Sequence, residues 1–182
     1  QSTPGSISII EVSITVEDTI TGVRKSIEIA DGNTSRKISV RIPAGSYTGS
    51  VVRMRNTENA TEELVLVVQV ARHPFLSIEK KGLIVDLPVT VNEATCGANI
   101  LVPSLDDQLI LKVPPQTQSE TYIRLQGRGI TLKDKSRGDL FYRIIVRVPD
   151  SGPSETLKEK TGALNEHYSG NLRASLPKSI LP

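Results

Sequence analysis

The sequence predicts a mainly β protein, with two tandem small β-sandwich or barrel-like domains related by an internal repeat, followed by a short C-terminal helix. Residues that favour strands are abundant, since Ile, Val and Thr together make 50 of the 182 residues. Apolar and polar residues alternate over short runs that are separated by frequent turn residues. The third observation is a pair of similar segments about 75 residues apart.

Two matched segments define the repeat. Residues 15–22, TVEDTITG, and residues 90–97, TVNEATCG, place Thr-Val and a final Gly at the same spacing, 75 residues apart. The strand-like runs that begin at Leu64 and Leu140 follow in the same order and are 76 residues apart. We therefore expect a first β domain at 1–73, a second at 74–150, and a C-terminal helix and tail at 151–182.

Strands are predicted where alternate residues are apolar and their neighbours polar. The expected strands are Ile10–Val16, Ile27–Ile29, Ile38–Ile42, Leu64–Val68, Leu83–Leu87, Leu109–Val113 and Leu140–Val148. Turns, where Gly, Pro or Asx accept unusual backbone angles, are expected at 31–33, 44–45, 106–107, 114–115 and 127–129. One helical turn is expected at 16–22 and another at 91–97, each stopped by its glycine.

The pattern changes after Pro149. Ser154 can cap a helix over residues 155–167, with Leu157, Leu164 and Tyr168 at helical spacings of seven and four. Such a narrow apolar stripe either packs on the second unit or meets a copy of itself, which would make the protein a homodimer. The alternative is a frayed chain terminus.

Composition excludes several classes of function. A formal charge of +2 gives no nucleic-acid footprint, and only two Phe and four Tyr are present to stack on sugars or bases. The single cysteine, Cys96, excludes an intramolecular disulfide and fits a reducing compartment such as the cytoplasm; we expect a small buried or half-buried thiol. No apolar run is long enough to span a membrane, and the start QSTPGS indicates a chain that begins inside a longer protein.

No catalytic group of residues is visible, so neither enzyme activity nor a cofactor or metal is predicted. His73 and His167 are 94 residues apart. The adjacent acids Asp106 and Asp107 would point to opposite faces of a strand, whereas a pair that shares acid–base work must face one space. The Gly127-Arg128-Gly129 turn opens no helix and so lacks the amide cradle of a phosphate-binding loop.

One strand is apolar on both faces. The run Leu64-Val65-Leu66-Val67-Val68 can fill a core with one face only. The other face is expected to form an exposed apolar patch or groove, which usually marks a binding site. The alternative is that the second sheet of a sandwich covers it.

These features resemble a known family. Residues 88–130, PVTVNEATCGANILVPSLDDQLILKVPPQTQSETYIRLQGRGI, with the linker His73-Pro74-Phe75 and the closing Gly138-Asp139-Leu140-Phe141, resemble the C-terminal substrate-binding region of DnaJ-type J-domain co-chaperones, over about Ile9 to Pro149. The resemblance implies two client-binding β domains and a dimerisation helix. It also implies a non-enzymatic cytoplasmic co-chaperone that binds unfolded polypeptides and presents them to the seventy-kilodalton heat-shock chaperone. The loop Ala30–Ser35 contains no cysteine, which implies the zinc-free subclass.

The resemblance also implies a site in the first domain, where an extended client, or the acidic C-terminal tail of the heat-shock chaperone, lies along a strand in an apolar depression. Strand addition suits a binder of many sequences, because backbone hydrogen bonds ignore side-chain identity. The matching peptide-binding positions are Ile10, Val12, Ile27, Ile29 and Leu66. For the acidic tail, Lys25 matches a basic position, Glu28 stands where a second lysine is usual, and Arg24 and Arg36 are candidates to compensate.

The chain contains no His-Pro-Asp triplet, because Phe75 follows His73-Pro74. By this resemblance it should hold clients without stimulating ATP hydrolysis. Two other functions stay open at this point. One is a co-chaperone that binds curved DNA, against which the near-neutral charge argues. The other is a structural β-sandwich module without a client.

Overall fold

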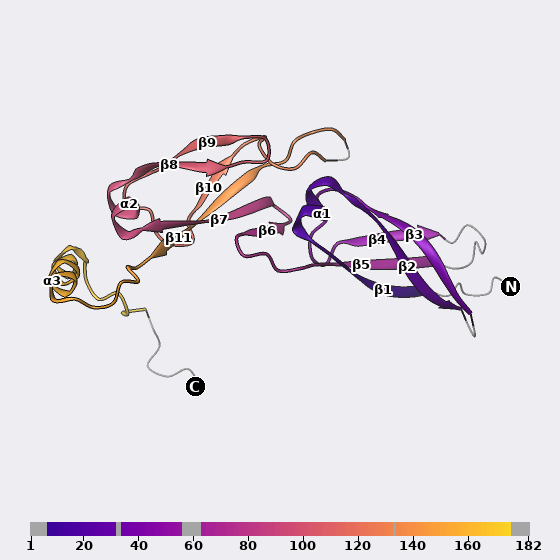
Figure 1. The fold of residues 1–182 in the computed structure, drawn as a ribbon, viewed down its shortest axis with the longest axis horizontal. Helices are drawn as coiled ribbons and strands as arrows, with labels where there is room; N and C mark the ends of the chain where they lie inside the picture. The colour runs from indigo at the N-terminus through magenta and orange to yellow at the C-terminus, as the bar shows by residue number, and fades with distance from the viewer. Residues whose placement is uncertain (1–6, 32–33, 56–62, 133, 176–182) are drawn as a thin grey trace. The chain divides into compact units, whose positions relative to one another are not determined.

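Two facing sheets build the first repeat (Figure 1). The computed structural model describes residues 7–31, 34–55, 63–132 and 134–175. In the first sheet, the central strand β5 pairs in parallel with β1 and antiparallel with β4, and the second sheet is the antiparallel pair β2 and β3. The elements are β1 (Ile7–Ile14), α1 (Val16–Thr21), β2 (Val23–Asp31), β3 (Thr34–Ile42), β4 (Val51–Arg55) and β5 (Glu63–Val70).

The second repeat has the same order of elements and one extra strand. Its parallel pair is β7 with β11, β10 pairs antiparallel with β11, and β8 pairs antiparallel with β9. The extra strand, β6 (Leu76–Glu79), pairs antiparallel with the start of β7. The other elements are β7 (Gly82–Thr90), α2 (Val91–Cys96), β8 (Ala98–Pro103), β9 (Gln108–Val113), β10 (Tyr122–Leu125) and β11 (Leu140–Arg147). The predicted mainly β fold is thus confirmed.

The two short helices are the most similar parts of the repeats. Thr15 and Thr90 are the N-caps, and each makes a capping box with the acidic residue three positions later. Each helix ends at a glycine of positive φ, +74° at Gly22 and +80° at Gly97. A Cβ at Gly22 would lie 3.0 Å from the backbone nitrogen of Ala44, so both backbone angle and space require glycine.

Each repeat has its own core. In the first, Leu64, Leu66 and Val68 of β5 share the interior with side chains from β1 and β3, namely Val12, Ile14, Val40 and Ile42. In the second, Tyr142 is fully buried and its hydroxyl donates to the Pro103 carbonyl oxygen at 2.6 Å. The buried residue Val16 and the half-buried Ile20, both of α1, pack on this second core.

Four strands, β4, β6, β8 and β10, were not predicted. Each has only four to six residues, too few for an alternation to stand out from the surrounding turns. The predicted turn at 31–33 lies mostly outside the described residues, as do positions 32–33 of the loop Ala30–Ser35.

The chain divides into two compact units, Gln1–Arg147 and Val148–Pro182. In the second unit, α3 (Glu155–Ala163) begins where predicted, because the Ser154 side chain accepts a hydrogen bond from the Leu157 backbone at 3.1 Å. A short 3₁₀ helix, Leu164–His167, completes the predicted helical stretch. Neither helix contains a buried residue. The boundary predicted between residues 73 and 74 stays a prediction.

Candidate functional site

The candidate site lies where β1 and β2 face each other with free edges. Within the described residues, β1 pairs only with β5, and β2 pairs only with β3. The two free edges adjoin, because the Lys25 ammonium nitrogen on β2 donates a hydrogen bond to the Ser13 carbonyl oxygen on β1 at 2.8 Å. Backbone groups along a free edge are available to another extended chain.

The five predicted peptide-binding residues all face the space between the sheets, at different depths. Leu66 is fully buried and Val12 is 5 % exposed, so both belong to the core. Ile10, Ile27 and Ile29 are half-buried and pack against that core. The structure therefore assembles the five around one apolar space, with the three isoleucines nearest to solvent.

Of the five predicted residues, Val12 and Leu66 are buried rather than exposed to solvent. Even-numbered residues of β5 point into the core, where the β2–β3 sheet covers them, so the alternative of a covering second sheet holds for that face. The face of β5 left uncovered carries Val65 and Val67 instead. Whether a residue of β5 faces the core depends on whether its position is even or odd. A run in which every residue is apolar does not indicate which of the two sets points inward.

The second repeat shows the same space closed. Val85 and Val102 stand at the repeat positions of Ile10 and Ile27, and they are only 7 % and 0 % exposed. There β6 pairs along β7, with Leu76 opposite Val85. On β7, the backbone N–H of Asp86, which follows Val85, donates a hydrogen bond to the Phe75 carbonyl oxygen at 2.8 Å. A strand of the chain itself covers the edge that stays free in the first repeat.

Lys25 is a charged residue in an otherwise apolar inward-facing row. Its neighbours on that face of β2 are Val23, Ile27 and Ile29, and its repeat counterpart is Ile100. Besides the Ser13 carbonyl, its ammonium group lies 4.0 Å from a carboxylate oxygen of Asp18. Because the second repeat has an aliphatic residue at this position, the fold does not need a charge there. In the first repeat, the lysine places a positive charge at one end of the apolar space.

The other predicted charged residues are more scattered. Arg24 is exposed on the outer face of β2, opposite Arg41. Arg36 is half-buried and lies opposite Ile29. Glu28 is exposed, with a carboxylate oxygen 3.3 Å from the ammonium nitrogen of Lys37. The structure therefore brings Lys25 to the groove and leaves Arg24 on the opposite surface of its strand.

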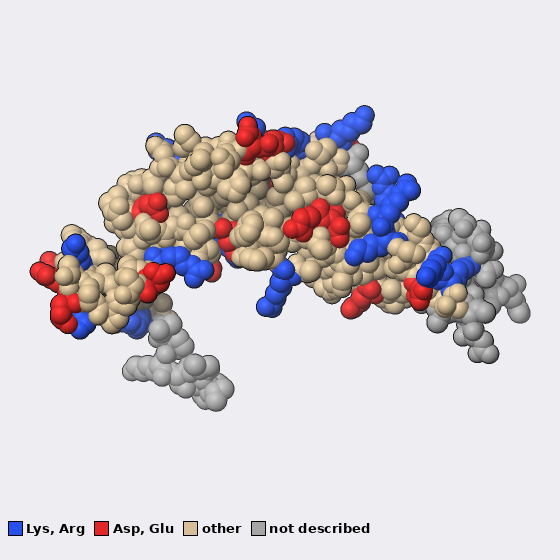
Figure 2. All heavy atoms as spheres, viewed as in Figure 1, with Lys and Arg blue, Asp and Glu red and all other residues tan. Residues whose placement is uncertain are grey.

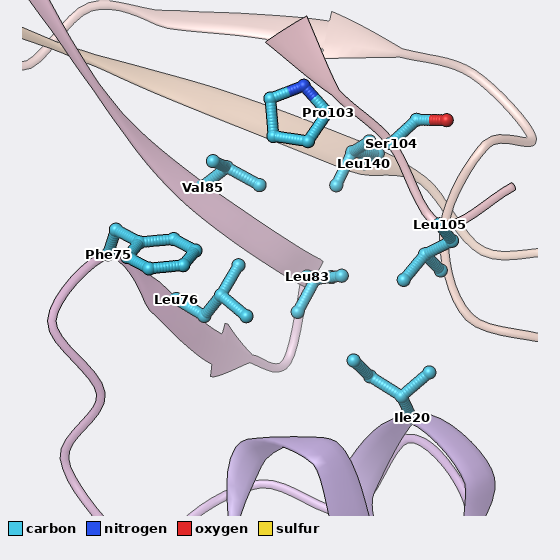
Figure 3. A pocket seen from close by; sticks show the side chains of 9 residues that line it. All are labelled: Ile20, Phe75, Leu76, Leu83, Val85, Pro103, Ser104, Leu105 and Leu140. Carbon is cyan, nitrogen blue, oxygen red and sulfur yellow. The ribbon is translucent and has the colours of Figure 1, made fainter. Parts of the chain in front are cut away.

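An apolar pocket of about 130 Å³ lies beside α1 and the second repeat. Figure 3 shows Ile20 of α1 pointing toward it from one side, opposite residues of the second repeat. Two wall residues, Val85 and Ser104, occupy the repeat positions of Ile10 and Ile29, so the pocket is what remains of the groove's counterpart. Sequence reasoning missed it because its wall comes from segments far apart: Ile20, Phe75, Leu76, Leu83, Val85, Pro103, Ser104, Leu105 and Leu140.

The acidic residues of the second repeat have structural partners. The Arg137 guanidinium donates two hydrogen bonds to Asp106, at 2.7 and 3.1 Å, and holds the pKa of that carboxyl below its ordinary value. Asp139 accepts hydrogen bonds from the Gly127 backbone at 2.9 Å and from Arg124 at 2.6 Å, and the backbone bond chiefly lowers its pKa. These pairs therefore tie the turns at residues 106–107 and 127–129 to other parts of the second repeat.

Among the described residues, no cluster of three or more His, Cys, Asp or Glu side chains could hold a metal ion. No helix in this part of the chain is long and apolar enough to cross a membrane. Cys96 is exposed, which corrects the expected burial: it is the last residue of α2, whose buried residue is Ala94, and its thiol lies 3.4 Å from the Asn92 side-chain oxygen. Figure 2 shows acidic and basic side chains interspersed over the face in view.

The structure combines a tandem β repeat with an apolar space, lined by Ile10, Ile27 and Ile29, that lies beside free strand edges of the first repeat. The DnaJ C terminal domain family matches residues 9–149. The chain belongs to that family and contains the C-terminal substrate-binding region of a DnaJ-type co-chaperone. The predicted family resemblance is thereby confirmed.

Proposed function

We propose that the first repeat binds extended apolar segments of unfolded polypeptides between β1 and β2, and so holds clients for the seventy-kilodalton heat-shock chaperone. The observation that carries this proposal is the contrast between the repeats. Ile10 and Ile27 are half-buried beside free strand edges, whereas their counterparts Val85 and Val102 are buried and the edge of β7 beside Val85 is paired with β6. The first repeat keeps open the place that the second fills with its own chain.

The chemistry of the groove fits a client of loose sequence. A segment that lies along a free edge gains backbone hydrogen bonds whatever its side chains are. Alternate apolar side chains of that segment can then contact Ile10, Ile27 and Ile29, over a floor formed by Val12 and Leu66. Affinity then depends on apolar spacing, which many unfolded chains share.

Lys25 adds a preference for a carboxylate at one end of the groove. An ammonium group beside an apolar row suits a segment that ends in acidic residues, such as the tail of the heat-shock chaperone. Because Glu28 is negative and Arg24 lies on the outer face, Lys25 and Arg36 are the basic residues that face the groove side of β2 and β3. We further propose that residues 151–182 form the dimer contact, and that the protein is of the zinc-free subclass.

The direct test measures binding of a fluorescent, extended apolar peptide by anisotropy. The double variant Ile10→Ser/Ile27→Ser should weaken binding at least tenfold, because it removes apolar contact area from the groove. Ile110→Ser is the matched control, since Ile110 is a 70 % exposed strand residue of the second repeat. Urea midpoints confirm that each variant is folded.

Two results would overturn the proposal. The first is undiminished affinity in the folded double variant, which would place the site elsewhere. The second is that the protein leaves the aggregation kinetics of a denatured client unchanged, which would favour a structural module without a client.

A further inference from the structure

The outer face of the β1–β5–β4 sheet carries an aliphatic stripe that lies opposite the groove. By strand register, Ile9 lies beside Val65, and Val67 lies beside Val51. Ile9 is 70 % exposed and Val51 is 53 % exposed, while Val65 and Val67 are half-buried. These four residues, called the outer stripe below, run diagonally across three strands from one sheet edge to the other.

Opposite charges flank the outer stripe. Glu11 lies beside Val67 on β1, on one side of the stripe, and Arg53 lies beside Val65 on β4, on the other side. Both charged residues are exposed, and Arg53 makes only a loose ion pair with Glu63, at 3.8 Å. The surface is therefore apolar along its diagonal, with exposed Glu11 on one flank and exposed Arg53, loosely paired with Glu63, on the other.

The fold does not require this face to be bare, because the second repeat covers the same face with its own side chains. There Ile84, the counterpart of Ile9, is fully buried. Arg143, the counterpart of Val67, makes two hydrogen bonds with Asp86, at 2.7 and 2.8 Å. The Lys81 ammonium nitrogen lies 3.5 Å from the ring centre of Tyr122, the counterpart of Val51. The first repeat has aliphatic side chains in place of this polar and aromatic cover.

The geometry of a sheet face selects the kind of partner. The backbone groups of a central strand are used within the sheet, so an extended chain laid on the face would bury its own polar groups without partners. A helix satisfies its backbone internally and buries only a side-chain stripe. The outer stripe spans roughly 12 Å by the usual strand spacing and rise, which is about two helical turns.

We propose that the outer stripe binds an amphipathic helix of a partner, basic on the flank that lies over Glu11 and acidic on the flank that lies over Arg53. This surface differs from the client groove in both position and chemistry. It would let the protein hold an extended client on one side of the first repeat and a folded helical partner on the other.

The probe is a fluorescent helical peptide of about 18 residues, with Leu at alternate spacings of three and four, Lys along one flank and Glu along the other. A second peptide has two central prolines, and two further peptides have Lys only or Glu only on both flanks. Anisotropy should show saturable binding of the Lys/Glu helix and at least tenfold weaker binding of the proline peptide.

Protein variants then locate the site. Ile9→Lys/Val51→Lys should weaken binding of the Lys/Glu helix at least tenfold, whereas Ile110→Lys, at equal exposure to Ile9, should change it less than twofold. Glu11→Lys reverses one exposed charge, and Arg53→Glu reverses an exposed charge that is loosely paired with Glu63. The first should shift preference toward the Glu-only helix and the second toward the Lys-only helix, each by about two- to fivefold.

Three outcomes would overturn the proposal. One is equal binding of the proline and helical peptides, which would indicate an extended ligand. Another is binding that none of the stripe or charge variants alters. The third is a fall in the particle mass of the protein alone on Ile9→Lys/Val51→Lys, measured by sedimentation, which would make a second copy of the chain the occupant of this face.

Discussion

The ammonium nitrogen of Lys25 lies 2.8 Å from the backbone carbonyl oxygen of Ser13, and this contact ties β2 to the free edge of β1. It closes one end of an otherwise apolar groove with a positive charge. An incoming carboxylate would exchange this neutral acceptor for a charged one, which forms a stronger hydrogen bond. We therefore expect Lys25 to hold β1 and β2 together and also to recognise an acidic ligand.

Replacing Lys25 with its repeat counterpart isoleucine should separate the two kinds of ligand. We expect Lys25→Ile to weaken binding of a peptide with an acidic C-terminus about three- to tenfold, a range that allows for solvent screening of a partly exposed charge. Binding of a neutral apolar peptide should be unchanged or tighter. Anisotropy titrations at low and high salt measure both, with Lys37→Ile as the control on the outer face of β3. Equal loss for both peptides would contradict the role of the charge.

The two faces of β5 should differ in what they contribute to stability. Val68 is fully buried in the first core, and its neighbour Val67 is half-buried on the outer face. Val68→Ala should lower the free energy of unfolding by about 2 kcal/mol, because two methyl groups and a cavity are involved. Val67→Ala should cost less than about 1 kcal/mol. Urea unfolding of the two variants would measure this, and equal costs would mean that the assigned parity of β5 is wrong.

Acid should destabilise the second repeat through Asp139. Its hydrogen bonds from Gly127 and Arg124 favour the carboxylate and lower its pKa in the folded state below the ordinary 3.8. A lowered folded pKa gives stability that is present above the unfolded value and is lost as pH falls through the folded one. Urea midpoints should therefore fall from about pH 5 downward. Asp139→Asn should lower the midpoint at pH 7 and flatten this fall.

Asp150→Asn is the control for that experiment, because Asp150 is exposed and lies outside the second repeat's turns. It should leave the whole profile unchanged. A profile for Asp139→Asn as steep as that of the unaltered protein would assign the acid sensitivity to other carboxylates, of which Asp106 beside Arg137 is the next to examine.

The C-terminal segment should determine the oligomeric state. The helix α3 has no buried residue, so its half-buried Leu157 and the following Leu164 are available to a second copy. We expect the full chain to sediment as a dimer and a chain that ends at Pro149 to sediment as a monomer, with client-peptide affinity per groove unchanged. The same particle mass for both chains would exclude residues 151–182 as the dimer contact.

Sequence patterns predicted the parts of this protein that depend on neighbours along the chain. The matched segments 15–22 and 90–97 predicted both helical turns, because capping residues and a stopping glycine act within one turn of backbone. Ser154 likewise marked the start of the C-terminal helix. The family resemblance indicated which strands line the groove. Short strands such as β6 escaped prediction, and with them the reason why the second groove is closed.

The strand-rich repeat and the positions of its helix caps can be inferred from the chain alone, since period, turn residues and caps are local properties. Which side chains meet solvent depends instead on how the strands pair and pack. Leu66 and Val67 are adjacent and similar in hydrophobicity, yet one fills the core and the other faces outward. Pairing partners and the covering sheet set that difference, because burial depends on residues brought together from distant parts of the chain.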